Sequence, residues 1–182
     1  MTRIAFAALL FASVAVAADP VQSGIPVGKR PGPYSFLVAT GPQRGQPTCY
    51  VCEQHEGGKP AAVVFARSLS DPLGKLLTKL DAAGAGKDAT GYKVWMTQVT
   101  PTADLDGLAA WSQKQGLKGV PVGAFEGPDG PPAYRLNPDA DVTVMLFVKT
   151  QVVANFAFRK GELTDKAVEQ VVGATPKLFT TK

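Results

Sequence analysis

The stretch PAAVVFARSLSDPL, residues 60–73, decides the fold. It starts with a continuous apolar run at residues 60–66, the pattern of a strand that is buried on both faces. Leucines at helical spacing follow up to residue 83, with Ser70 or Asp71 as the cap and Pro72 in the first turn. A buried strand that leads directly into an amphipathic helix predicts an α/β domain.

The same alternation continues toward the C-terminus. The expected elements, in chain order, are a strand at 92–99, a helix at 102–115, a short strand at 120–125, and strands at 142–148 and 152–158. The last two strands, joined by Lys149-Thr150-Gln151, should form an antiparallel hairpin, and Thr164 should cap a final helix. The pattern predicts a central mixed sheet flanked by helices.

The first 18 residues have the pattern of a secretory signal peptide. Arg3 precedes an apolar run from Ile4 to Val16, and the small residues A-V-A end the segment. The run is too short for a membrane span, which needs about 20 apolar residues. We expect an exported protein, periplasmic or extracellular, without a membrane span in its mature form.

Composition divides the rest of the chain into three parts. Residues 19–60 form an irregular N-terminal arm rich in Gly and Pro, whose apolar run 34–39 could add an edge strand. Residues 61–175 form the body, and residues 176–182 form a C-terminal tail. Loss of Arg3 lowers the formal charge from +4 to about +3. The basic residues are scattered, which argues against nucleic-acid binding.

The segment TCYVCEQH, residues 48–55, contains both cysteines and the only histidine. Covalent haem attachment needs C-x-x-C-H and is excluded, because Glu53 follows Cys52. A C-x-x-C pair can close a disulfide, which persists outside the cytoplasm. Zinc would lack a fourth ligand here, whereas copper(I) could use C-x-x-C-x-x-H with His55. His55 by itself is interpreted as a solvated loop residue.

The chain resembles the thioredoxin-like superfamily, in its redoxin and peroxiredoxin branch. Phe65, Leu69 and SDPL (70–73) take the places of the family pattern F-x-x-x-W-C-x-P-C, and Pro72 is kept. The segments GKRPGPY (28–34) and GKPAAVVF (58–65) resemble the start of peroxiredoxins. The resemblance implies the thioredoxin-like fold over residues 28–175.

The usual functional residues of this branch are absent. Ser70 and Leu73 stand near the positions of the reactive cysteines, and Val142 stands where the family has a cis-proline. These substitutions argue against peroxidase activity. Ser70 is interpreted as a helix cap, since a serine hydrolase would also need a nearby base.

Two functions are left open. In the first, Cys49 and Cys52 exchange disulfides with a disulfide-containing protein or a small thiol, without a cofactor. Cys49 is then the expected nucleophile, because the N-terminal cysteine of such pairs is usually the exposed one. In the second, the disulfide is structural and the domain is a non-enzymatic binding module. The sequence leaves open whether the arm reaches the Ser70 end, where Arg67 would favour a thiolate.

Overall fold

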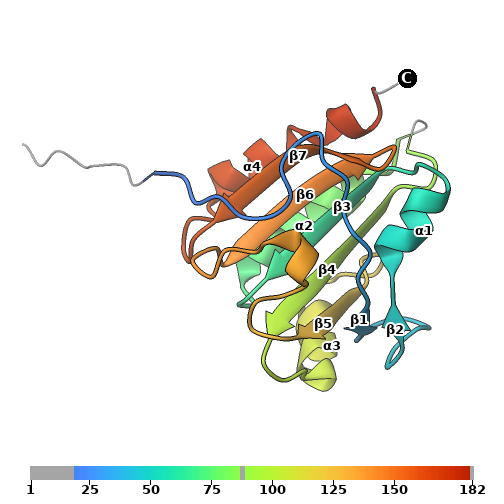
Figure 1. The fold of residues 1–182 in the computed structure, drawn as a ribbon. Helices are drawn as coiled ribbons and strands as arrows, with labels where there is room; N and C mark the ends of the chain where they lie inside the picture. Colours follow the sequence, from blue (N-terminus) through green and yellow to red (C-terminus); the bar gives the residue numbers. More distant parts are fainter. Residues whose placement is uncertain (1–18, 87–88, 181–182) are drawn as a thin grey trace, which may run out of the picture.

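One mixed sheet of seven strands organises the molecule (Figure 1). The computed structural model describes residues 19–86 and 89–180, so the expected signal peptide lies outside the described residues. The strands are β1 (Phe36–Val38), β2 (Pro47–Thr48), β3 (Ala61–Ala66), β4 (Lys93–Thr100), β5 (Val122–Glu126), β6 (Val142–Val148) and β7 (Gln151–Phe158). Their order across the sheet is β2-β1-β5-β4-β3-β6-β7. Strand β3 pairs in parallel with β4 and antiparallel with β6.

Four α-helices and two 3₁₀ turns complete the described chain. They are α1 (Tyr50–Glu56), α2 (Asp71–Ala83), α3 (Leu105–Lys114), η1 (Pro132–Tyr134), α4 (Asp165–Val172) and η2 (Thr175–Leu178). In this part of the molecule no helix is long and apolar enough to cross a membrane.

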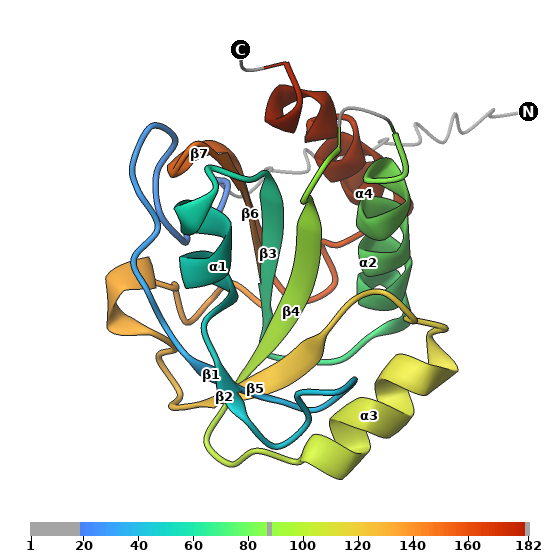
Figure 2. The same cartoon turned by 90° about the vertical axis from the view of Figure 1, so that its right-hand side faces the viewer.

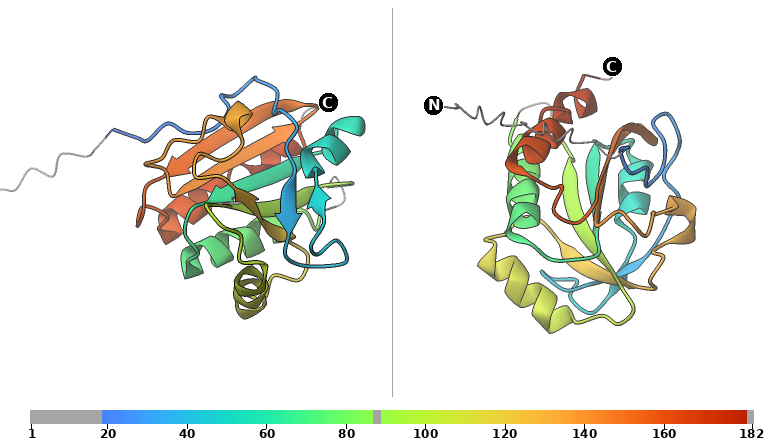
Figure 3. Two further views of the ribbon diagram at one scale, coloured as in Figure 1. Left: turned by 60° about the horizontal axis from the view of Figure 1, so that its bottom comes forward. Right: turned by 90° about the vertical axis from the view of Figure 1, so that its left-hand side faces the viewer.

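The sheet separates two apolar cores, because successive side chains of a strand point to opposite faces. In β3, Ala62, Val64 and Ala66 pack with the leucines of α2, whereas Val63 and Phe65 pack with α1 and the arm. Helices α2 and α4 therefore cover one face, and α1 covers the other (Figure 2). The arm and η1 lie on the α1 side of the sheet (Figure 3, right).

The strands and helices expected for the body are confirmed, with ends that shift by three residues or fewer. Ser70 caps α2 by accepting a hydrogen bond from the Leu73 N–H at 3.3 Å. Thr164 caps α4 in the same way, through the Ala167 N–H. The expected hairpin is present as β6 and β7.

Two segments differ from the expectation. The arm, expected to be irregular apart from one edge strand, also contains β2 and α1. The tail, expected from residue 176, is in part the turn η2, and its Leu178 is buried in the core between the sheet and α4. In both segments, long-range packing orders a piece of chain that has little periodicity of its own.

Long-range hydrogen bonds hold the arm against the sheet. The Gly28 N–H donates to the Val152 carbonyl at 2.8 Å, and the Val152 N–H donates to the Lys29 carbonyl at 2.9 Å. Farther along, the buried Tyr34 hydroxyl accepts from Trp95 Nε1 at 2.8 Å and lies 2.9 Å from Thr97 Oγ1. These bonds fix residues 28–34 between the β7 edge and the centre of the sheet.

Candidate functional site

The two cysteines form a disulfide at the start of α1. Cys49 is the residue that caps the helix, and Cys52 lies in its first turn, with 5.4 Å between the two Cα atoms. Cys49 Sγ accepts a hydrogen bond from the Cys52 backbone N–H at 3.3 Å. An N–H that donates to sulfur stabilises a negative charge there, so the geometry favours Cys49 as a leaving thiolate.

Contacts along α1 fix the position of the disulfide. The Tyr50 ring packs edge-on against Phe36 and Trp95, with centroids 5.6 and 5.7 Å away. The buried Gln54 side chain donates to the carbonyls of Pro60 and Gly91, both at 2.8 Å, and so ties α1 to the starts of β3 and β4. These tertiary contacts, rather than intrinsic helix propensity, hold the short helix α1 in place.

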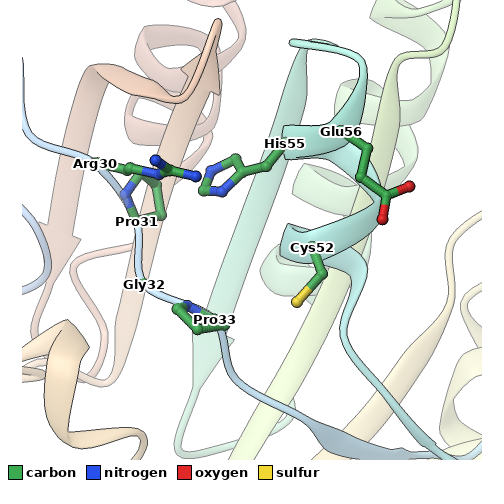
Figure 4. A pocket seen from close by; sticks show the side chains of 7 residues that line it. All are labelled: Arg30, Pro31, Gly32, Pro33, Cys52, His55 and Glu56. Atoms are coloured by element: carbon green, nitrogen blue, oxygen red, sulfur yellow. The ribbon is translucent and has the colours of Figure 1, made fainter.

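One face of α1 forms the wall of an open pocket. Cys52, His55 and Glu56 lie three and four residues apart, a spacing that puts their side chains on the same side of a helix. The arm supplies the opposite wall, residues 30–33, and the pocket has a volume of about 500 Å³. Figure 4 shows the Cys52 sulfur directed toward Pro33 across this space.

His55 is not the solvated loop residue that the sequence suggested: it belongs to helix α1 and is half-buried in the pocket wall. Its ring packs edge-on against Phe147, with centroids 5.6 Å apart. Nε2 is buried and has no hydrogen-bond partner among the described residues. Burial, followed by the nearby Arg30 charge, lowers the pKa of His55 below its usual value, so the imidazole is neutral at pH 7.

The pocket has one cation directed inward. The Arg30 guanidinium points toward the His55 ring, whereas the Glu56 carboxylate points away from Arg30 (Figure 4). Because His55 is neutral, the positive charge in the pocket beside Cys52 comes from Arg30.

The Ser70 end of α2 is separate from this pocket. The disulfide belongs to the core on the α1 face, and the first turn of α2 belongs to the core on the opposite face. Arg67 donates to the carbonyls of Pro128, Asn137 and Ala140, away from the cysteines. The arm therefore does not bring Cys49 and Cys52 to the position that the resemblance assigns to a redox dithiol.

The structure also distinguishes the two cysteines. Both are half-buried, but Cys52 lines the pocket, whereas Cys49 packs against the core on the α1 face. The expectation from the sequence that Cys49 is the nucleophile stays untested, and the pocket points instead to Cys52 as the sulfur that a partner reaches. Sequence reasoning missed Arg30, because nothing in residues 28–34 indicates which part of the chain they face.

Copper(I) binding by C-x-x-C-x-x-H would need three ligands that already face one another. Within the described ranges, 19–86 and 89–180, no group of three or more His, Cys, Asp or Glu side chains is placed to hold a metal ion. Both sulfurs of C-x-x-C-x-x-H belong to the disulfide.

Comparisons with known proteins identify the fold. No protein-family model and no curated protein sequence matches the chain. Among solved structures, a putative protein disulfide isomerase from Bacteroides thetaiotaomicron is similar, with a TM-score of 0.62 and 15% identity over 86% of this chain and 92% of its own.

Two further structures show the same likeness. A secreted Mycobacterium tuberculosis disulfide oxidoreductase homologous to E. coli DsbE has a TM-score of 0.55 and 13% identity over 80% of this chain and 96% of its own. Peroxiredoxin Q from Xanthomonas campestris has a TM-score of 0.53 and 15% identity over 79% of this chain and 89% of its own. The chain therefore has the thioredoxin-like fold. Ser70 stands at the α2 terminus, where the resemblance of the sequence implies a reactive cysteine.

Proposed function

We propose that the protein is an exported thiol/disulfide exchange protein whose reactive group is the Cys49–Cys52 disulfide. The observation that carries this proposal is the position of Cys52, which lines an open pocket beside Arg30 and His55. A disulfide with only a structural role has no need of such access. The similarity in fold to disulfide oxidoreductases supports the same chemistry, although the residues used here differ.

The exchange begins at Cys52. An incoming thiolate attacks Cys52 Sγ from the pocket, forms a mixed disulfide, and displaces Cys49 as a thiolate. The Cys52 N–H, 3.3 Å from Cys49 Sγ in the closed form, stabilises that leaving group. A second thiol then attacks the sulfur of the bound thiol and releases Cys52. Two thiols lose two electrons and two protons, and the protein becomes a dithiol.

The reverse direction uses the same two sulfurs. A reduced protein attacks a disulfide in its partner through Cys52, and Cys49 then attacks Cys52 Sγ to release the reduced partner. Each direction requires access to Cys52 and a stabilised thiolate at Cys49. The partner is a disulfide-containing protein or a small thiol.

The proposed compartment is outside the cytoplasm. The pattern of residues 1–18 supports export, and a disulfide persists in such a compartment. N-terminal sequencing of the protein from fractionated cells tests this part, with a start at Ala18 or Asp19 as the expected result. An intact N-terminus in the cytoplasmic fraction would refute it.

The redox potential tests the function. We expect equilibrium with glutathione buffers to give a potential between about −120 and −270 mV, the range of exchange-active pairs. A potential below about −300 mV would refute the proposal and leave the disulfide structural. The Cys49→Ser variant should be trapped as a mixed disulfide at Cys52, and Cys52→Ser should react more slowly.

The structural alternative has one observation in its favour. Cys49 packs against the buried core on the α1 face, as a cysteine that anchors a loop would. In that case the domain serves as a binding module. The same potential measurement separates the two functions.

A further inference from the structure

A second pocket adjoins the disulfide pocket. It has a volume of about 290 Å³ and is lined by Ile25, Pro26, Lys29, Arg30, Ala133 and Arg135. Arg30 lines both pockets, so the two lie next to each other along the arm, and we call them together the recess. Together they match the size of small-molecule sites, about 300 to 1,000 Å³.

The charge of this recess is strongly positive. Lys29, Arg30 and Arg135 are exposed, and in the described part of the chain none of their side chains forms an ion pair. The second pocket has no acidic residue in its lining. Glu56, which lines the first pocket, directs its carboxylate away from Arg30 (Figure 4).

Backbone hydrogen bonds fix the segments that carry these cations. The Lys29 carbonyl accepts from the Val152 N–H at 2.9 Å, and the Arg135 carbonyl accepts from the Gly24 N–H at 3.3 Å. Ile25 and Ala133 add apolar surface to the lining of the same pocket. The recess therefore combines the Cys52 sulfur, three exposed cationic side chains on anchored backbone segments, and a small apolar surface.

We infer that the thiol partner of the disulfide is a small organic thiol with two or more carboxylates. Its sulfur meets Cys52, one carboxylate pairs with Arg30, and a second pairs with Lys29 and Arg135. This inference rests on the proposed exchange activity and specifies the substrate class of the same site.

The test compares thiols of different charge on the same disulfide. The rate of reduction of the Cys49–Cys52 bond is measured with mercaptosuccinate (two carboxylates), 2-mercaptoethanol (neutral) and cysteamine (cationic), each corrected for its thiolate fraction. The reference is the oxidised peptide TCYVCEQH, residues 48–55, which keeps the local sequence and lacks the recess. The ratio of the mercaptosuccinate rate to the 2-mercaptoethanol rate should be about tenfold higher for the protein than for the peptide.

Variants separate charge from structure. Arg30→Gln should remove most of the preference, and Arg30→Lys should restore part of it. Lys29→Gln and Arg135→Gln should each reduce it about two- to threefold, and added salt should weaken it in the wild type. Lys160→Gln, at the opposite end of the β6–β7 hairpin, is the matched control and should change nothing. Circular dichroism checks that each variant is folded.

The outcomes distinguish the two proposals. Equal rate ratios for protein and peptide, with a potential in the exchange-active range, would overturn the carboxylate preference alone. A potential below about −300 mV, with no thiol reacting faster on the protein than on the peptide, would overturn the exchange function itself. A preference for cysteamine would also contradict the inference.

Discussion

The backbone N–H of Cys52 donates to Cys49 Sγ at 3.3 Å, so one cysteine is a hydrogen-bond donor to the other. The two cysteines are therefore not equivalent: Cys49 Sγ accepts this hydrogen bond, whereas Cys52 lies at the pocket wall. We predict that the Cys49 thiol of the reduced protein has a pKa below the free-cysteine value of about 8.5. The thiolate absorbance of Cys52→Ser, followed against pH, measures it. Cys49→Ser is the comparison, and a Cys49 pKa equal to or above that of Cys52 would contradict the assignment.

Ser70 should act only as a cap. Ser70→Ala removes the side-chain acceptor of the Leu73 N–H and should lower the free energy of unfolding by about 1 kcal/mol, without changing the rate of exchange. Thr164→Ala, which removes the equivalent bond at α4, is the matched control and should cost a similar amount. Urea denaturation and the reduction rate are measured on both. A loss of exchange in Ser70→Ala alone would mean that the α2 end takes part in the chemistry.

Reduction of the disulfide should destabilise the domain only slightly. Closing a four-residue ring removes little entropy from the unfolded chain, and the loop formula gives about 2 kcal/mol at 25 °C. Urea unfolding with and without a reductant measures the difference. The Cys49→Ser, Cys52→Ser double variant should be insensitive to the reductant. A loss several times larger would show that the disulfide is needed to hold α1 and its surroundings together.

His55 should make stability depend on pH. Its pKa in the folded state is lowered, first by burial and then by Arg30, so folding favours the neutral ring. The stability due to this group is complete above the unfolded pKa of about 6.5 and is lost as the pH falls through the lower, folded value. Between about pH 7 and pH 5, the wild type should lose stability more steeply than His55→Gln. Arg30→Gln should give a pH dependence of the free energy of unfolding between those of the wild type and His55→Gln. The same pH dependence in the wild type and His55→Gln would contradict the prediction.

The hairpin turn offers a stabilising substitution. Lys149 and Thr150 link β6 to β7 with φ values of 50° and 65°, the left-handed region, which is unfavourable for a branched side chain such as threonine. Thr150→Gly should raise the free energy of unfolding by about 1 kcal/mol, because glycine has no Cβ to strain. Thermal unfolding measures it. A lower melting temperature would show that the threonine side chain makes contacts that outweigh the strain.

The body of the fold was predictable because its signals are local. The apolar run at 60–66, the leucines of α2 and the cap residues Ser70 and Thr164 each specify an element without help from distant residues. Helix α1 was not predictable in this way. Only Tyr50, Val51 and Gln54 are buried in its seven residues, and Gln54 is a polar residue that stays buried because it meets two backbone carbonyls.

The candidate site was predictable only in part. The spacing of Cys49 and Cys52 indicates the disulfide, but Arg30 is brought to it by the bonds between residues 28–29 and Val152, which are more than a hundred residues apart in the chain. Periodicity carries no information about such a pairing. The same holds for His55, whose burial depends on Phe147 in a distant strand.

The placement of the disulfide on the α1 face changes the direction from which a partner must approach. A molecule shaped to dock at the α2 terminus would have the full thickness of the sheet between its own sulfur and Cys52. In the proposed exchange reaction, partner recognition is thus separated from the α2 terminus, where the resemblance places the redox site. The exposed residues of the arm and α1 that a partner would contact can therefore change without any change in the residues that build the sheet.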